Sequence, residues 1–241
     1  MTTTPFRMEV RASDLTPAGV LRNEHVRAIV DVLVRRGGFA MLPSDTCYSL
    51  ATVPGGRLMS ERINRILTRP EGEPITVSFD GIPLMKEWVE LNEVAIRFLD
   101  SLTPGPLTLV CDAAPTLNPL ITEDVLDAPD GTVGVRIPDS NIERQVVTAC
   151  KKPVTTPAVR TLDKVPVTDY QQAREIIEEG LARNGEPFAL ITVEARNPFL
   201  ETHSTVVRVQ GKTLEGLYHV IRPGAISKDR LEEALFGFSG A

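Results

Sequence analysis

The alternation of helical stripes with short apolar runs constrains this chain more than any other feature of its sequence. Residues 23–36 carry apolar side chains at positions 26, 29, 30 and 33, the spacing of one helix face, and two glycines at 37–38 end the pattern. The short apolar run 39–42 follows at once and predicts a buried strand. Helical and strand patterns alternate in this way along the chain. We therefore expect an α/β (α+β) fold, in which a twisted, mostly mixed or antiparallel open sheet carries helices on its faces.

Further segments continue the alternation. Runs rich in β-branched residues predict strands at 75–79, 107–113, 132–137, 154–159, 188–194, 204–210 and 217–223. Helical patterns occupy 61–68, 84–102, 141–150, 169–184 and the residues after 227, with expected N-caps at Ser60, Ser140, Thr168 and Ser227. Pro157 limits the run 154–159 to a sheet edge or to the irregular end of a strand. The sequence lacks the glycine-rich fingerprints of dinucleotide and P-loop sites, and its 241 residues predict one domain over 1–241.

Charge and cysteine content narrow the functional class. A formal net charge of -6 argues against indiscriminate nucleic-acid binding, which needs a broad basic face. The three cysteines at 47, 111 and 150 match neither a zinc pattern nor a disulfide framework, so we expect a reduced, cytoplasmic protein. The histidines share no metal-ligand spacing, and we expect no metal held by the protein. Residues 1–10 carry no apolar h-region and no run approaches ~20 apolar residues, so we expect neither a signal peptide nor a membrane partner.

Small polar or cationic side chains stand at the ends of several predicted strands. The triplet 44–46, Ser-Asp-Thr, directly follows the strand 39–42, and Arg69, Arg136 and Arg222 each lie beside proline or glycine. One interpretation is purely structural: the triplet forms a turn, and each arginine is an exposed surface side chain. The other is an anion site, because guanidinium groups match phosphate and carboxylate geometry. Three arginines that point into one cavity favour the anion site, because their mutual repulsion lowers stability unless a bound anion neutralises it.

Six short motifs occur in order at these strand ends. They are P-S-D-T-C-Y-S-L at 43–50, R-P at 69–70, T-P-G-P-L-T at 103–108, V-G-V-R-I-P at 133–138, S-T-V-V at 204–207 and R-P-G at 222–224. Together they resemble the YrdC-like family, whose reference activity is threonylcarbamoyl-AMP synthase. The likeness runs from about residue 23 to about residue 226, and it rests on all six motifs because any one of them alone is weak.

The resemblance implies a concave sheet around a positively lined cavity. Enzymes of the family condense ATP, bicarbonate and L-threonine, usually with Mg²⁺, into threonylcarbamoyl-AMP and pyrophosphate, which suits a closed cavity because carbamate is unstable in water. Partner proteins then use the product to modify tRNA. Carried over by motif, the resemblance implies that the amino-acid substrate is bound by Thr46, Tyr48, Arg136 and Asp45. It implies that the phosphates are bound by Arg69, Ser204, Arg222 and Thr156. The implied catalytic residues are Arg69, Arg136 and Thr46. Cys47 is expected to pack rather than react, and Arg136→Ala is expected to abolish turnover with the fold intact.

Two departures from the family pattern leave the activity open. Leu67 stands where the family has a lysine, and Pro157-Ala158-Val159 stand where it has Ser-Ala-Asn. The YciO-type branch of the family resembles this chain in that it also lacks the Ser-Ala-Asn motif. Each lost contact to a charged oxygen is worth about 1.5–3 kcal/mol. Three readings follow: an N-carbamoyl-AMP synthase, the same chemistry on another amine, or a silent protein that binds nucleotide or, weakly, tRNA or other RNA. Two lysines at 151–152 and Arg160 either compensate or are surface charges, the interpretation that exposure statistics favour.

Overall fold

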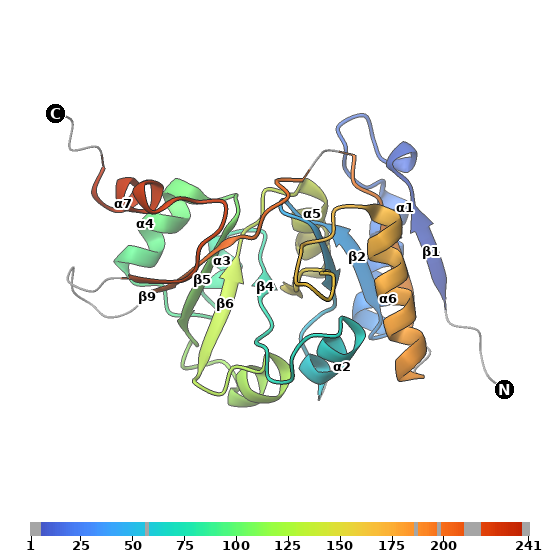
Figure 1. The fold of residues 1–241 in the computed structure, drawn as a ribbon, viewed down its shortest axis with the longest axis horizontal. Helices are drawn as coiled ribbons and strands as arrows, with labels where there is room; N and C mark the ends of the chain where they lie inside the picture. The colour runs from blue at the N-terminus through green and yellow to red at the C-terminus, as the bar shows by residue number, and fades with distance from the viewer. Residues whose placement is uncertain (1–5, 56–57, 186–187, 197–198, 210–217, 238–241) are drawn as a thin grey trace.

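Two β-sheets lie side by side in the computed structural model, which describes residues 6–55, 58–185, 188–196, 199–209 and 218–237 (Figure 1). The first sheet has four strands in the order β1-β8-β2-β3. Its strands are β1 (Arg7–Val10), β8 (Leu190–Val193), β2 (Phe39–Pro43) and β3 (Tyr48–Ala51). The strands β1, β8 and β2 run parallel, and β2 and β3 form an antiparallel hairpin. The Ser-Asp-Thr triplet is therefore part of a hairpin turn.

Helices cover both faces of this sheet because its strands are apolar on both sides. Along β2, Ala40 and Leu42 pack with α1 (Asn23–Val30), its π-helical continuation Asp31–Arg35 and α5 (Asn141–Cys150). Phe39 and Met41 face the other way, toward α2 (Met59–Ile66) and α6 (Tyr170–Asn184). Figure 1 shows α6 and α1 on opposite sides of β2.

The second sheet has six strands in the order β10-β9-β5-β6-β4-β7. They are β10 (Tyr218–Arg222), β9 (Thr205–Val209), β5 (Leu107–Asp112), β6 (Thr132–Arg136), β4 (Val77–Ser78) and β7 (Val154–Thr155). Apolar residues at every second position, such as Leu107 and Leu109, pack one face against α4 (Glu93–Leu102) and α7 (Lys228–Phe236). The opposite face carries the cavity described below.

The segment after β7 connects the two sheets. Ser49 of β3 forms a bridge with Ala158, and two backbone hydrogen bonds flank it: Leu50 N–H donates to Pro157 O at 3.1 Å, and Val159 N–H donates to Tyr48 O at 2.8 Å. Pro157 uses only its carbonyl here, so its missing N–H costs nothing. The prediction that Pro157 ends a regular strand is confirmed.

The fold class predicted from the sequence is confirmed, with two sheets where one was expected. Three boundaries were wrong. Leu58 rather than Ser60 is the N-cap of α2, because Ser60 is buried and donates to the Asp124 carbonyl instead. Asp169 rather than Thr168 caps α6. The expected helix 84–102 is divided into α3 (Ile82–Met85) and α4, because Val89 makes a bridge with Ala113.

The strands β1 and β3, each four residues long, had no counterpart among the predicted elements. Ser140 and Ser227 are the N-caps of α5 and α7, as predicted. The predicted strands 204–210 and 217–223 include residues 210 and 217, which lie outside the described residues. In the part of the chain that the structure describes, every helix is too short or too polar to cross a membrane.

Candidate functional site

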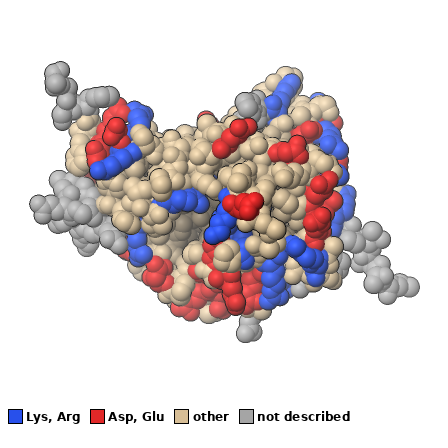
Figure 2. Space-filling view, viewed as in Figure 1, with Lys and Arg blue, Asp and Glu red and all other residues tan. Residues whose placement is uncertain are grey.

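A cavity of about 530 Å³ opens on the uncovered face of the six-stranded sheet. Its floor consists of alternate residues of three strands, because side chains on one face of a strand recur every second position. These residues are Thr108 and Val110 of β5, Thr132, Gly134 and Arg136 of β6, and Val206 and Arg208 of β9. Most of them are small, so the sheet surface stays hollow. Figure 2 shows this hollow, with Lys and Arg side chains gathered around it.

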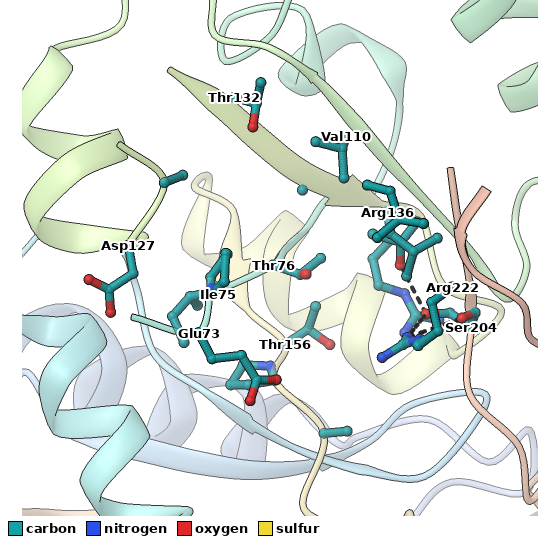
Figure 3. A pocket seen from close by; sticks show the side chains of 18 of the residues that line it. Glu73, Ile75, Thr76, Val110, Asp127, Thr132, Arg136, Thr156, Ser204 and Arg222 are labelled. Atoms are coloured by element: carbon teal, nitrogen blue, oxygen red, sulfur yellow. Dashed lines mark hydrogen bonds between the residues drawn. The ribbon is translucent and has the colours of Figure 1, made fainter. Parts of the chain in front are cut away.

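Arg222 and Ser204 form one polar end of the cavity (Figure 3). The Arg222 guanidinium donates to the Ser204 carbonyl at 3.0 Å and to its hydroxyl at 3.1 Å, and that hydroxyl lies 3.0 Å from the hydroxyl of Thr108. Gly224 makes this close approach possible, since a Cβ there would lie 2.4 Å from His203 O and 2.6 Å from Ser204 O. Within the described residues no carboxylate pairs with Arg222, so its charge is free to meet an anion.

A second group of charges consists of Arg69, Glu73 and Arg160. Glu73 accepts from Arg160 at 2.7 and 2.9 Å and from Arg69 at 2.9 Å. The side chains of the two arginines are only 7% and 14% exposed. A loop places them: Arg69 follows the end of α2, and its guanidinium also donates to the Pro74 carbonyl at 3.0 Å. The Glu73 carboxylate thus neutralises only one of the two positive charges of Arg69 and Arg160.

Arg136 projects from the end of β6 and is held from behind by acidic side chains. It donates to Asp45 in the β2–β3 turn, and both side chains are 5% exposed. Asp45 also accepts from the Asp139 N–H at 3.1 Å. Glu143 of α5 faces Arg136 and the hydroxyls of Ser44 and Ser78 without a hydrogen bond of ordinary geometry. Burial lowers the pKa of Arg136, but Asp45 and Glu143 more than reverse this, so its guanidinium stays charged.

The electrostatics of the cavity favour an anion. Burial lowers the pKa of Arg69 to about 10, with Glu73 opposing and Arg160 adding to the effect. Burial and Arg160 lower the pKa of Arg222, and burial followed by Arg222 and Arg160 lowers the pKa of His203. Cations that depress one another in a partly dry space mark a region of positive potential. An anionic ligand would relieve that repulsion.

The structure brings six of the eight site residues named from the sequence to this cavity. They are Thr46, Arg69, Arg136, Thr156, Ser204 and Arg222. Asp45 lies behind Arg136 and lines a different groove, with the T-P-G-P turn. Tyr48 does not line the cavity either: it is buried in the core, where its hydroxyl accepts from the Ala195 N–H at 2.9 Å and its ring packs on Phe199. The expectation that Tyr48 walls the pocket therefore has no support in its position.

The positions that depart from the family pattern also have clear places. Leu67 is buried in the hydrophobic core at the end of α2, and Val159 is buried there as well. Pro157 and Ala158 line the cavity but offer no side-chain hydrogen bond. The two lysines at 151–152 are exposed and away from the cavity. Arg160 does line it, so the expectation that all three cations are surface charges was wrong for Arg160.

Sequence reasoning missed the roles of Glu73 and Glu143 around the cavity. Glu73 lies in a loop rich in proline and glycine, where an acidic residue predicts only a solvated turn. The spacing of Ser140 and Glu143 in the sequence predicts a capping box for α5. Ser140 does accept from the Glu143 N–H at 3.2 Å, but the Glu143 side chain turns inward to Arg136 instead of back to the cap. Thr108 was visible as the last residue of a motif, although no role had been assigned to it.

Comparison with known proteins agrees with this fold. A family model described as "Telomere recombination", for Sua5, YciO and YrdC, matches residues 32–224. The threonylcarbamoyl-AMP synthase of Mus musculus is 25% identical over 202 residues, which cover 83% of this chain and 67% of that protein.

Two solved structures share the architecture. The Pyrococcus abyssi Sua5 structure complexed with L-threonine superposes with a TM-score of 0.75 at 19% identity, covering 96% of this chain but only 61% of the longer Sua5 chain. The structure of E. coli YciO superposes with a TM-score of 0.71 at 20% identity, covering 94% of this chain and 99% of that one. With the family model matched over most of its length, the chain belongs to the Sua5/YciO/YrdC family.

Proposed function

We propose that this protein is a nucleotidyltransferase that condenses ATP, bicarbonate and an amino acid into an N-carbamoyl-AMP, pyrophosphate and water. L-Threonine is the first amino acid to test, because threonylcarbamoyl-AMP synthases are among the relatives and the Sua5 structure was solved with L-threonine. The product would pass to partner proteins that form threonylcarbamoyladenosine in tRNA, or to a related pathway. The observation that carries the proposal is the convergence of Arg69, Arg136 and Arg222 on one cavity.

The chemistry asks for positioning and charge stabilisation rather than a covalent nucleophile. Attack on the α-phosphate builds negative charge on phosphoryl oxygens, which fixed donors stabilise in a partly dry site. Arg222 and the Ser204 hydroxyl offer such donors at one end of the cavity. Arg136 and Thr46 lie on the lining where an amino-acid carboxylate would be held, and the Arg136 Nε has no partner within the described residues. Holding the reactants together also protects the carbamate from water.

Magnesium would reach the cavity as part of the nucleotide. Across the described ranges no group of three or more His, Cys, Asp or Glu side chains is placed to hold a metal ion. Three carboxylates line the cavity. Glu73 is paired with two arginines, Asp130 is paired with Arg208 at 3.0 Å, and Asp127 accepts from the Asn64 amide at 3.2 Å, so this donor set does not fit a resident metal. Nucleotide-bound Mg²⁺ takes its ligands largely from phosphates and water, which demands no dedicated protein site.

The test is amino-acid-dependent release of pyrophosphate from ATP in the presence of Mg²⁺ and bicarbonate, with the adenylate identified by mass. Arg222→Ala should lower this turnover at least about a hundredfold, because the residue would contact transition-state charge. Arg27→Ala, on the exposed side of α1, is the matched control and should leave turnover unchanged. Turnover that survives Arg222→Ala would contradict the assignment of the site.

A silent nucleotide- or RNA-binding protein is the second candidate. Leu67, Pro157 and Val159 favour it, because none of them supplies the polar contact that the family pattern has there. Calorimetry with Mg-ATP, combined with the assay for the adenylate product, separates the two functions. Binding without any carbamoyl-adenylate, across the common amino acids, would favour the silent protein.

A further inference from the structure

His203 is a titratable side chain of the cavity that the proposed function leaves without a role. It directly precedes Ser204 and lines the cavity together with Arg222. Its backbone is fixed, because its carbonyl accepts from the Ala225 N–H at 2.9 Å. Figure 3 shows Ser204 and Arg222 beside Arg136, so His203 belongs to the end of the cavity where the amino-acid carboxylate would be held.

The groups around the ring keep His203 neutral at neutral pH. Burial lowers the pKa of His203, and the charges of Arg222 and Arg160 lower it further, whereas the Lys164 carbonyl favours the protonated ring. These groups come from β10, from the segment after β7 and from the turn at 161–165. A neutral imidazole has one nitrogen without a proton, so this side chain can accept one.

The acidic side chains that line the cavity already have partners among the described residues. Glu73 is bound to two arginines, and Asp130 pairs with Arg208 at 3.0 Å. Asp127 accepts from the Asn64 amide at 3.2 Å. A carboxylate is also a weak base, because its pKa lies far below that of an amine. Imidazole titrates near neutral pH, which suits proton transfer under working conditions.

We propose that His203 is the general base that accepts a proton from the substrate amino group as the carbamate forms. The inference rests on the proposed function. The amino acid enters as an ammonium ion, and its nitrogen bonds to the carbon of bicarbonate. The nitrogen loses two protons: one leaves with a bicarbonate hydroxyl as water, and the other goes to the ring. Ammonium, bicarbonate and imidazole thus give carbamate, water and imidazolium. Repulsion by Arg160 and Arg222 then helps the half-buried ring to release its proton to solvent.

His203→Gln tests this role, because glutamine can form a hydrogen bond but cannot take up a proton at neutral pH. Amino-acid-dependent pyrophosphate release should fall about a hundredfold or more in kcat, the effect of a lost general base, while calorimetry should find the affinity for Mg-ATP unchanged. The acid limb of the wild-type kcat/KM profile should lie below pH 6.5 and should be absent in the variant. His203→Ala should regain turnover when free imidazole is added.

His219→Gln is the matched control. His219 is exposed on β10 and lies outside the lining of the cavity, so its replacement should leave both the rate and the pH profile unchanged. Turnover of His203→Gln with the wild-type profile would overturn the base and leave the proposed function standing. A slower variant that keeps the acid limb, with a His203→Ala variant that imidazole does not rescue, would give the residue a structural role only and would also overturn the base.

A titration by NMR gives a readout that needs no turnover. The ring signal of His203, identified by its loss in His203→Gln, should titrate below 6.5 in the free wild-type protein. A ring that is already protonated at pH 7 would overturn the base whether or not the adenylate is made. Wild-type protein that shows the expected titration but makes no adenylate would contradict the proposed function, and the base with it.

Discussion

Arg136 at the end of β6 and Asp45 in the β2–β3 turn form a buried ion pair that ties the two sheets together directly behind the cavity. Removing one partner of such a pair leaves the other charge buried and unpaired. Asp45→Asn should therefore lower the free energy of unfolding by about 3 kcal/mol. Urea denaturation at neutral pH measures this loss.

A double-mutant cycle separates the pair from its surroundings. In an Arg136→Met background, Asp45→Asn should cost much less than it does in the wild type. An equal cost in both backgrounds would show that Asp45 acts mainly through its bond to the Asp139 N–H. The same pair alters an expectation from the sequence: Arg136→Ala strands Asp45 and Glu143, so a loss of activity in that variant cannot be separated from a loss of fold.

Gly224 should tolerate no side chain, although it is not in a left-handed conformation. A Cβ there meets the backbone oxygens of His203 and Ser204 at 2.4 and 2.6 Å, so the start of β9 has to move away from Arg222. We expect Gly224→Ala to weaken Mg-ATP binding at least about tenfold, because the Arg222–Ser204 contact is charge-assisted. Gly81→Ala is the control, since its nearest neighbour would lie at 3.5 Å. Comparable affinities of the two variants would argue against this role of Gly224.

Glu143 should make the protein less stable as the pH rises. Burial raises its pKa in the folded state above the ordinary value of 4.5, with Arg136 offsetting only part of the shift. The folded state then binds more protons than the unfolded state between the two pKa values, so stability falls as pH rises through that window. Asp45, Arg136 and Cys47 are the other titratable groups around this carboxyl.

Glu143→Gln should remove this penalty. We expect the variant to match the wild type below pH 4.5 and to be the more stable protein at neutral and higher pH, as followed by urea denaturation across pH 4–9. Glu179→Gln, on the exposed side of α6, should show no such divergence. If the charged Glu143 instead stabilises Arg136, its replacement will lower stability at neutral pH.

The three thiols should be inert in the folded protein. Burial raises the pKa of Cys47 to about 11, of Cys111 to about 12 and of Cys150 to about 11, and none of them forms a disulfide. The thiolate is the reactive form, so little of it is present at pH 8. A thiol reagent should therefore label the native protein only as fast as it unfolds, and should label three groups in denaturant. Rapid labelling of the native protein at Cys47, located by mass spectrometry, would contradict the packing role of that residue.

Long periodic segments made much of the fold predictable. The helical stripe at 23–36 and the β-branched runs of the second sheet predicted the right elements. In these segments the spacing of the apolar residues matches the face that the element buries. The arrangement in two sheets was not predictable, since the first sheet depends on the short strands β1 and β3 and is joined to the second by backbone bonds from Pro157 and Val159 to β3. Such long-range pairing leaves no local pattern in the sequence.

The site was predictable to the extent that its residues sit in motifs. Four of them lie at the ends of strands or helices, namely Arg69, Arg136, Ser204 and Arg222. At such positions a cationic or hydroxyl side chain predicts an anionic ligand. Arg160 and Glu73 define each other only through their contact at 2.7 Å, across 87 residues of chain. Their role depends on that pairing, which no spacing along the sequence reveals.

The position of β8 has a consequence for synthesis on the ribosome. Leu190–Val193 lies between β1 and β2, which belong to the first 43 residues of the chain. The nascent chain thus carries two unpaired strand edges until about four-fifths of it has been made. Release from the tunnel of this single late strand closes the first sheet, so a chain that terminates before it would leave β1 without a place in the fold.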